Sequence, residues 1–203
     1  MEDTYRTLEN PAEGSFREKG SRFLAFGYPV DNPGDVKGIL AGIKKKYHDA
    51  RHHCYAYRMG YFGEISRVCD GGEPSGTAGK PIYGQLLSNN LTNTLVVVVR
   101  YFGGVLLGTG GLINAYRSAT ADMLSRAPIV TRFAVNVFRV VFPYDALDVV
   151  LKIMRDENAT TLEQDFNTRC SMQVGVRKSC SEKVLKRLSL IPGLSCELLQ
   201  NTH

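Results

Sequence analysis

The sequence lacks long apolar segments, a secretory start and closely spaced cysteine pairs. Its longest aliphatic run, Leu95 to Val99, is far shorter than the roughly 20 residues that a membrane helix needs. The first residues are acidic, which is the wrong start for a secretory signal. The five cysteines are odd in number and form no CxxC pair, so neither a disulfide framework nor a zinc ribbon is indicated. We therefore expect a cytoplasmic protein with no membrane partner, no bound metal and no cofactor.

Charge of neither sign dominates. The 203 residues include 25 Lys or Arg and 20 Asp or Glu, and the formal net charge of +5 favours anionic partners only mildly. Basic residues are dense only between positions 44 and 53, where Asp49 is the one acid. This basic run consists of Lys44, Lys45, Lys46, His48, Arg51, His52 and His53. Two interpretations stay open for it: a solvated helix face, and an RNA-binding surface with Tyr47, Tyr55 and Tyr57 nearby for stacking.

Residues 1–127 are expected to form one region of mixed helices and strands. Apolar residues at helical spacing predict helices over 36–47 and 112–123. The first strand is expected near Ser15. A central strand over 94–100 is expected to be buried on both faces, because it shows no polar alternation.

The pattern changes after Pro128. It predicts strand 132–142, helix 144–157, strands 159–166 and 170–177, helix 180–190 and strand 193–199. This order is the β-α-β-β-α-β unit of ferredoxin-like domains. Ser179 and Glu182 have the spacing of a capping box for its second helix. We expect an α+β protein with two domains, 1–127 and 128–203.

Five glycines follow the central strand. They are Gly103, Gly104, Gly108, Gly110 and Gly111. Glycine in a regular element costs about 0.5 to 1 kcal/mol relative to alanine, so this density indicates positive φ or close backbone approach. A glycine loop that opens a helix presents free N–H groups to an anion, and Arg100 is expected to emerge at its mouth. The spacing fits neither a Walker A loop nor a dinucleotide loop, and a tight turn without a ligand is the alternative.

A second glycine-rich loop, "DGGEPSGTAGKPI", covers residues 70 to 82. Three interpretations stay open for its polar residues. Carboxylates could hold Mg²⁺ beside a phosphate, the polar side chains could bond the loop's own N–H groups, or they could form a recognition surface. The expected supporting residues are Asp70, Glu73, Ser75 and Thr77. No spacing fixes a nucleophile and base, so no catalytic residue is assigned.

Four segments together resemble the IMPACT family in its short bacterial, YigZ-like form. They are "KGSRFLA" (19 to 25), "DARHHCYAYR" (49 to 58), "DGGEPSGTAGKPI" (70 to 82) and "VVVVRYFGGVLLGTGGLINAYRSAT" (96 to 120). Family members usually carry paired aspartates before the glycine, whereas here Asp70 is followed by Gly71. This departure weakens a metal site built on two carboxylates.

The resemblance implies an N-terminal β-α domain shared with a ribosomal small-subunit protein and elongation factor G, and a C-terminal domain like another domain of that factor. It also implies a link to translational control and stress response. In eukaryotic members, restraint of a starvation-activated kinase is associated with an extra N-terminal domain. We expect no room for that domain before the first strand, so the kinase role is not carried over.

The expected function is a non-catalytic translation regulator that binds RNA or the ribosome, with a protein partner in translation as a further expectation. The alternative is a phosphorylated-small-molecule binding protein or enzyme that uses the same cleft. The expected anion-contacting residues are Arg100, Gly103, Gly104, Gly108, Gly110, Gly111, Lys80, Arg51 and His52.

Overall fold

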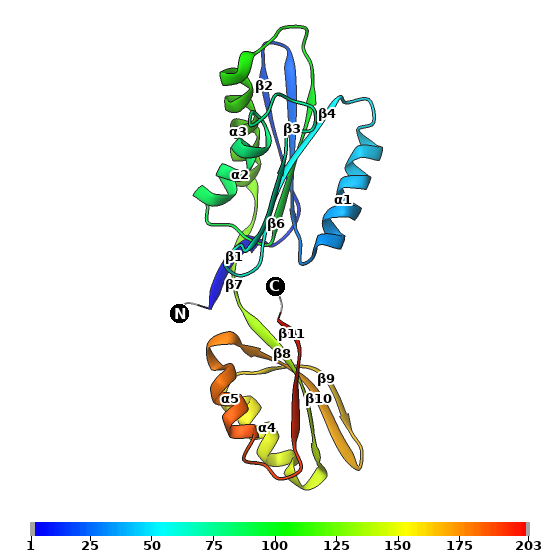
Figure 1. Cartoon of the computed structure of the whole chain (residues 1–203), viewed down its shortest axis with the longest axis vertical. Helices are drawn as coiled ribbons and strands as arrows, with labels where there is room; N and C mark the ends of the chain where they lie inside the picture. Colours follow the sequence, from blue (N-terminus) through cyan, green and yellow to red (C-terminus); the bar gives the residue numbers. More distant parts are fainter. Residues whose placement is uncertain (1–2, 202–203) are drawn as a thin grey trace. The chain divides into compact units, whose positions relative to one another are not determined.

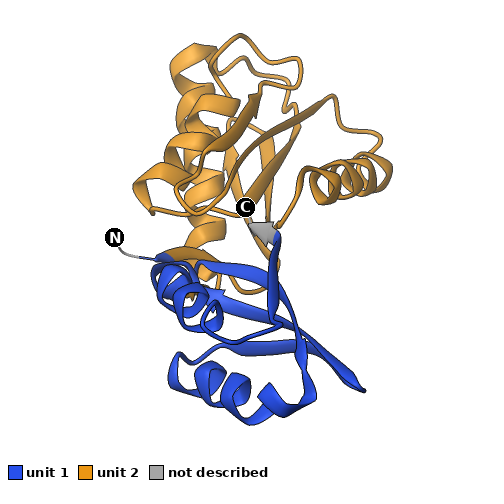
Figure 2. Cartoon of the chain, turned by 60° about the horizontal axis from the view of Figure 1, so that its bottom comes forward, with its two compact units in different colours: residues 1–4, 133–202 blue, residues 5–132, 203 orange. Residues whose placement is uncertain are grey.

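The structure is a computed structural model that describes residues 3–201. These residues form two compact units, one of residues 5–132 and the other of residues 3–4 and 133–201 (Figure 2). Both units combine a sheet with helices, which confirms the expected α+β class. The domain assignment to 1–127 and 128–203 stays a prediction. Within residues 3–201, no helix has the length and apolar character that a membrane span requires.

An antiparallel five-stranded sheet forms the centre of the 5–132 unit, in the order β2-β3-β6-β4-β5. Its strands are β2 (Ala12–Glu18), β3 (Ser21–Pro29), β4 (His52–Met59), β5 (Ile65–Cys69) and β6 (Thr94–Tyr101). The central strand β6 is buried from Thr94 to Arg100, as its unbroken aliphatic run predicts. β6 therefore supports packed layers on both faces of the sheet.

Helices cover the two faces of this sheet unequally (Figure 1). Helix α1 (Pro33–Lys46) packs on one face, while α2 (Gly79–Ser88) and α3 (Gly108–Arg126) pack on the other. Helix α1 begins with a capping box in which Asn32 accepts bonds from backbone N–H groups and Asp35 bonds back to the cap. Each face has its own apolar core, so side chains that alternate along one strand enter different cores.

Two short strands lie outside the five-stranded sheet. Strand β1 (Thr4–Leu8) pairs with β7 (Ile129–Phe133). The expectation that the first strand lies near Ser15 is therefore wrong, because β1 precedes it. Strand β1 is only five residues long and has little alternation, which explains why its sequence gives a weak signal.

The second unit is an antiparallel four-stranded sheet in the order β11-β8-β10-β9. Its elements are β8 (Val135–Pro143), a 3₁₀ turn (Tyr144–Ala146), α4 (Leu147–Asp156), β9 (Thr160–Phe166), β10 (Arg169–Arg177), a 3₁₀ turn (Lys178–Cys180), α5 (Ser181–Leu188) and β11 (Ser195–Asn201). Helices α4 and α5 pack on one face of this sheet around a single apolar core. The expected ferredoxin-like β-α-β-β-α-β order is confirmed.

The predicted capping box of α5 is wrong. Ser179 lies in the 3₁₀ turn before the helix, and its hydroxyl donates to the carboxylate of Asp3. Cys180 occupies the cap position and makes no side-chain capping bond. The sequence spacing was correct for the motif, but the extra turn moved Ser179 away from the helix start.

Four connections meet at one end of the five-stranded sheet, because the strands are antiparallel and their registers align them there. The β2–β3 turn, the start of β4 and the ends of β5 and β6 share this end, since Arg100 pairs with both Phe23 and His52. Helices α2 and α3 also begin here. We call this region the loop end, and it contains both glycine-rich segments.

Candidate functional site

Arg100 does not emerge at the loop mouth as expected. It is 5% exposed, and its Nη1 donates to Glu73 Oε1 at 2.8 Å and Oε2 at 3.0 Å. Its Nη2 lies 3.5 Å from Ser21 Oγ, and its guanidinium stacks near Phe23 at 5.5 Å. The strand alternation places Arg100 on the buried α2/α3 face, so its charge is neutralised inside the protein rather than offered to an anion.

Glu73 is the centre of a buried polar cluster. Its side chain is 3% exposed, and besides Arg100 it accepts a 2.8 Å hydrogen bond from the hydroxyl of Tyr116. The thiol of Cys54 lies 3.2 Å from that hydroxyl, and burial raises the pKa of Cys54 to about 12. The cluster therefore ties the 70–79 loop to β4, β6 and α3, and it contains no thiolate near neutral pH.

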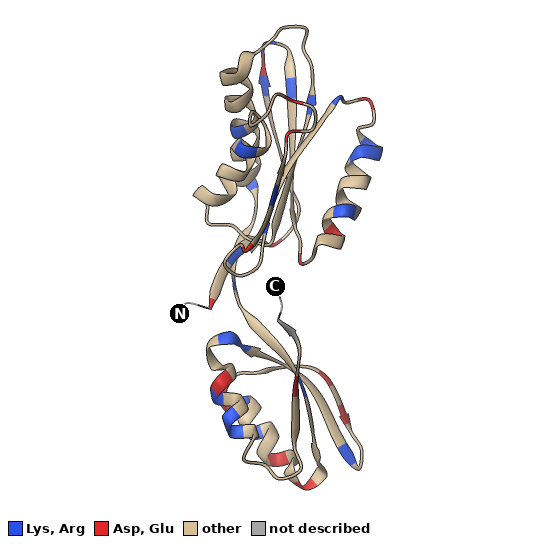
Figure 3. Ribbon diagram, viewed as in Figure 1, with Lys and Arg blue, Asp and Glu red and all other residues tan. Residues whose placement is uncertain are grey.

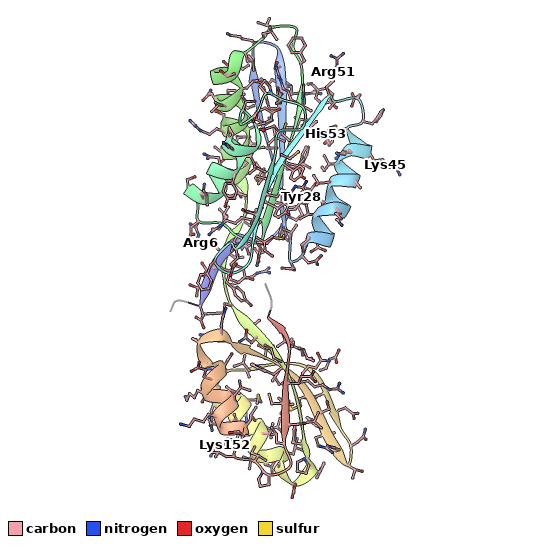
Figure 4. All side chains as sticks on the ribbon, in the orientation of Figure 1. Arg6, Tyr28, Lys45, Arg51, His53 and Lys152 are labelled. Carbon is pink, nitrogen blue, oxygen red and sulfur yellow. The ribbon has the colours of Figure 1, made fainter. Side chains whose placement is uncertain are left out.

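His52 lies beside this cluster and is partly buried, with 22% of its side chain exposed. Its Nδ1 lies 3.2 Å from the Gly71 carbonyl oxygen and 4.0 Å from Glu73 Oε1. The ring is thus engaged with the 70–79 loop, and its predicted contact with an anion is not supported by the geometry. His53 points to the other face of β4, between the sheet and α1, where its Nε2 lies 3.0 Å from the Tyr47 carbonyl oxygen (Figure 4).

Asp70 accepts hydrogen bonds from the backbone of its own loop. Its carboxylate accepts hydrogen bonds from the N–H groups of Gly76 at 2.9 Å, Ala78 at 3.1 Å and Gly79 at 2.8 Å. Burial by itself raises the pKa of Asp70, but the three backbone bonds outweigh it and hold the pKa below its ordinary value. Since Gly79 begins α2, Asp70 also caps that helix and occupies its positive end.

Thr77 and Ser75, the other two expected supporting residues, differ in their surroundings. The Thr77 hydroxyl is buried and donates to the Pro74 carbonyl oxygen at 2.6 Å, while Ser75 is exposed. Asp70 binds the loop's own N–H groups, as the second of the three interpretations expected, whereas Glu73 accepts from Arg100 and Tyr116 instead. Among residues 3–201 no group of three or more His, Cys, Asp or Glu side chains could hold a metal ion. The hydrogen bonds of Asp70 and Glu73 within the protein therefore do not favour the Mg²⁺ interpretation.

The second glycine segment is shorter as a loop than its sequence suggests, because α3 begins at Gly108. Gly103 has a packing role: a Cβ there would lie 1.9 Å from the carbonyl carbon of Gly20 in the β2–β3 turn. Its N–H donates to Ser21 Oγ at 3.2 Å. Gly104 and Gly108 have positive φ values of 86° and 71°. These three glycines are required by the fold itself.

The first turn of α3 is open to solvent. Gly108, Thr109 and Gly110 are exposed, Leu107 at the cap position makes no side-chain capping bond, and the turn contains no acid. A Cβ at Gly110 would meet nothing within 4 Å, whereas one at Gly111 would lie 3.0 Å from Leu107 Cβ. The N–H groups and positive dipole end of α3 are therefore available to an anion.

Basic side chains lie at the same end of the sheet. A hollow of about 430 Å³ beside the β2–β3 turn is lined by Arg17, Glu18, Lys19, Gly20, Ser21, Arg22 and Tyr101. Three of these are cations and one is an acid. Arg51 projects outward from the connection between α1 and β4 (Figure 4). Lys80, in the first turn of α2, is exposed and lines a different hollow together with Arg117.

The basic run between positions 44 and 53 is divided by the fold. Lys44, Lys45 and Lys46 form the exposed last turn of α1, where they complement its dipole (Figure 3). The nearby tyrosines are not free for stacking. Tyr47, Tyr55 and Tyr57 are partly buried against the core under α1. This burial does not favour their expected role in base stacking, because the alternation along β4 directs Tyr55 and Tyr57 toward the core under α1.

Sequence reasoning missed the residues that are exposed instead. Phe102 is 51% exposed and Leu106 is 84% exposed, in the loop between β6 and α3. Arg22 lies over the ring of Tyr101 at 4.7 Å, and the Tyr101 hydroxyl donates to Asp49 at 2.7 Å. A signal for Phe102 was present: an aromatic residue directly after the last strand residue and before two glycines has no buried face to occupy.

The sheet of the second unit has a different character. A hollow on it of about 290 Å³ is lined by Arg139, Glu163, Gln164, Asp165, Ser171 and Gln173. The two carboxylates lie on β9, and acidic positions are visible on that strand in Figure 3. Two acids beside one arginine disfavour a polyanion. The loop end of the 5–132 unit is the better candidate site.

Comparison with known proteins agrees with the fold. The profile of the Impact N-terminal domain matches residues 19–124. An IMPACT family member of Haemophilus influenzae is 32% identical over 173 residues, covering 84% of this chain and 82% of that protein. YigZ of Escherichia coli is 29% identical over 160 residues, covering 78% of each chain. A crystal structure described only as a hypothetical protein superimposes with a TM-score of 0.71 at 25% identity, covering 98% of both chains. The two long glycine-rich segments that shape the loop end fall inside the matched domain, and the chain belongs to the IMPACT family.

Proposed function

We propose that this chain is a non-catalytic, translation-associated regulator that binds RNA or the ribosome through its loop end. The observation that carries the proposal is the exposed, uncapped first turn of α3. Free N–H groups and the helix dipole favour an anion there, and a glycine at position 110 lets a phosphate approach the backbone closely. RNA supplies such phosphates in a repeating array.

The side chains around this turn suit a nucleic acid better than an isolated ion. Arg17, Lys19 and Arg22 add positive charge at the β2–β3 turn, and Arg51 adds more from the connection before β4. Phe102 offers an exposed ring on which an unpaired base can stack. Charge and stacking together are the combination by which proteins bind single-stranded RNA.

The buried cluster supports a binding role rather than catalysis. A catalytic thiol needs thiolate character, whereas burial raises the pKa of Cys54 to about 12. A general base needs a free lone pair near the substrate, whereas Glu73 is enclosed and paired with Arg100. The bonds from Glu73 to Arg100 and Tyr116 hold the 70–79 loop against β6 and α3. The translation assignment rests on the family's association with translational control, which the resemblance implies.

Filter binding of the whole chain to structured RNA over a salt series tests the proposal. We expect binding that weakens as salt rises, because each phosphate contact releases counterions. Replacing Arg22 with Gln is expected to weaken binding and to reduce the salt slope by about one. Lys152→Gln on α4 is the matched control, since Lys152 is an exposed cation of the second unit (Figure 4). Absence of binding at low salt, or equal losses in both variants, contradicts the proposal.

A further inference from the structure

We propose that the hollow between α2 and α3 binds the phosphoryl group of a small organic phosphate. The hollow measures about 390 Å³ and is lined by Gly76, Lys80, Pro81, Gly84, Gln85, Ile113 and Arg117. This volume lies within the usual range of small-ligand sites, about 300 to 1,000 Å³. The site is separate from the α3 terminus and the β2–β3 turn, so it does not depend on the proposed RNA surface.

The charge of the lining points to an anion. Lys80 and Arg117 both line the hollow, and no carboxylate does. Within residues 3–201 neither cation forms a salt bridge or a side-chain hydrogen bond. Two cations that share one hollow repel each other, and an anion between them relieves that repulsion. Arg117 can also offer the two parallel N–H donors that match phosphate oxygens.

The neutral part of the lining suits an organic body attached to the phosphate. Pro81 and Ile113 contribute apolar surface, and Gln85 contributes an amide that can donate or accept. A bare inorganic ion would leave this apolar surface uncovered. The expected ligand therefore combines one phosphoryl group with a compact, partly apolar body.

Gly84 has no internal reason to be glycine. It lies in the middle of α2, has no positive φ, and a Cβ at this position would meet nothing within 4 Å. Glycine in the interior of a helix lowers helix stability, so an explanation is needed. Since Gly84 lines the hollow, a side chain there would enter it. Its absence keeps the floor of the hollow open.

The wall of the hollow is held in place before any ligand arrives. Gly76 donates its N–H to Asp70, and its φ of 77° fixes the turn at the rim. The Cδ of Lys80 lies 3.6 Å from the position of a Cβ on Gly76, so the lysine stem rests against this rim. A rigid rim that supports the cation reduces the ordering that binding requires.

Titration of the whole chain with inorganic phosphate, ribose 5-phosphate and adenosine monophosphate, followed by amide NMR, tests this site. We expect an organic phosphate to shift the amides of Gly76, Lys80, Gly84 and Arg117, and to bind more tightly than inorganic phosphate. Arg117→Gln should weaken binding about tenfold, and Gly84→Leu should abolish it by filling the hollow. Lys45→Gln, on the exposed last turn of α1, should leave binding unchanged.

Circular dichroism of each variant establishes that it is folded, and Arg117→Gln alters only an exposed side chain. If none of the probes shifts these amides, the site does not exist. If a short RNA shifts them while the small phosphates do not, the small-molecule ligand is wrong and the hollow belongs to an RNA-binding surface. An Arg22→Gln variant that binds RNA more weakly but binds the organic phosphate as tightly as wild type separates this proposal from the proposed function.

Discussion

The two glycine-rich segments of the loop end look alike in sequence but differ in how their backbone N–H groups are bonded in the structure. The 70–79 loop contains two acids, and both are directed inward: Asp70 binds three backbone N–H groups and Glu73 pairs with Arg100. The 101–111 segment contains no acid, and the helix that it opens begins without a cap. The carboxylate of Asp70 binds amides of the first segment, whereas the first turn of α3, in the second segment, leaves its amides exposed.

This difference shows that glycine content alone does not identify a ligand loop. Both α2 and α3 begin at the loop end, so both dipoles direct positive potential there. The carboxylate of Asp70 neutralises the start of α2 from within. Among residues 3–201, no carboxylate caps the start of α3 in this way. The presence of an internal carboxylate is therefore the feature that separates a structural glycine loop from an available one.

The largest expected loss of stability comes from removing the buried ion pair between Arg100 and Glu73, which holds the 70–79 loop in place. We expect Arg100→Met to destabilise the 5–132 unit by about 3 to 5 kcal/mol, because it leaves the Glu73 carboxylate buried without its cation. Urea denaturation monitored by circular dichroism measures the change. The double replacement of Arg100 and Glu73 by Met should be less damaging than Arg100→Met alone, since no buried charge remains.

Arg117→Gln is the matched control for this experiment, because Arg117 is an exposed arginine of the same unit. Its effect should stay within about 0.5 kcal/mol. A loss of similar size in the control and in Arg100→Met would mean that the buried pair has no special role. The 70–79 loop would then not be locked as the geometry indicates.

A second test removes the internal cap of α2. Asp70→Asn should cost about 2 kcal/mol, because an uncharged amide oxygen replaces a carboxylate that accepts three backbone bonds. The folded-state pKa of Asp70 lies below its ordinary value of 3.8, so its contribution is complete above that value and is lost as pH falls through the folded pKa. Denaturation of both proteins across acidic pH measures this.

The pH dependence distinguishes the carboxylate from a general effect of the substitution. The gap in stability between wild type and Asp70→Asn should be widest near neutral pH and should narrow as the solution becomes strongly acidic. A gap that is constant over the whole range contradicts the role assigned to the Asp70 charge.

The third test concerns the packed half of the 101–111 segment. Gly103→Ala places a methyl group 1.9 Å from the Gly20 carbonyl carbon and 2.1 Å from the Ser21 nitrogen. Because these neighbours are backbone atoms, the β2–β3 turn has to move, at a cost of about 1 to 3 kcal/mol. Thermal unfolding measures the loss. Gly104 is a useful control, since a Cβ there meets nothing within 4 Å and only its positive φ opposes a substitution.

The regular elements were predictable where periodicity is strong. The second unit follows its sequence pattern closely, because β10 alternates over most of its length and α4 and α5 each have one apolar stripe. The buried strand β6 was also predictable from its aliphatic run. The short strand β1 and the 3₁₀ turn at Ser179 were not, since both depend on contacts with distant parts of the chain.

The sequence predicted where the candidate site lies, but not which contacts its individual residues make. The sequence identified both glycine segments, but it could not show that Glu73 reaches Arg100, because the partners are 27 positions apart. A charged residue on a buried strand needs an internal partner, and the nearby loop offered more than one acid. Alternation along β4 could have assigned Tyr55 and Tyr57 to the core under α1. The exposure of Phe102 was also open to prediction, because this residue follows the last residue of β6 and precedes two glycines.

The smallest expected change in stability comes from Gly110→Ala at the start of α3. This substitution is expected to change stability and RNA binding in opposite directions. Gly110 is exposed, has no positive φ, and a Cβ there meets nothing within 4 Å. Gly110→Ala should therefore stabilise the fold by about 0.5 to 1 kcal/mol, by removing backbone freedom from the unfolded chain. If a phosphate approaches the backbone here, the added methyl group should weaken RNA binding several-fold. Thermal unfolding and filter binding on the same preparation measure both effects. A variant that is more stable and binds RNA as tightly as wild type would show that the open amides of α3 are not the contact.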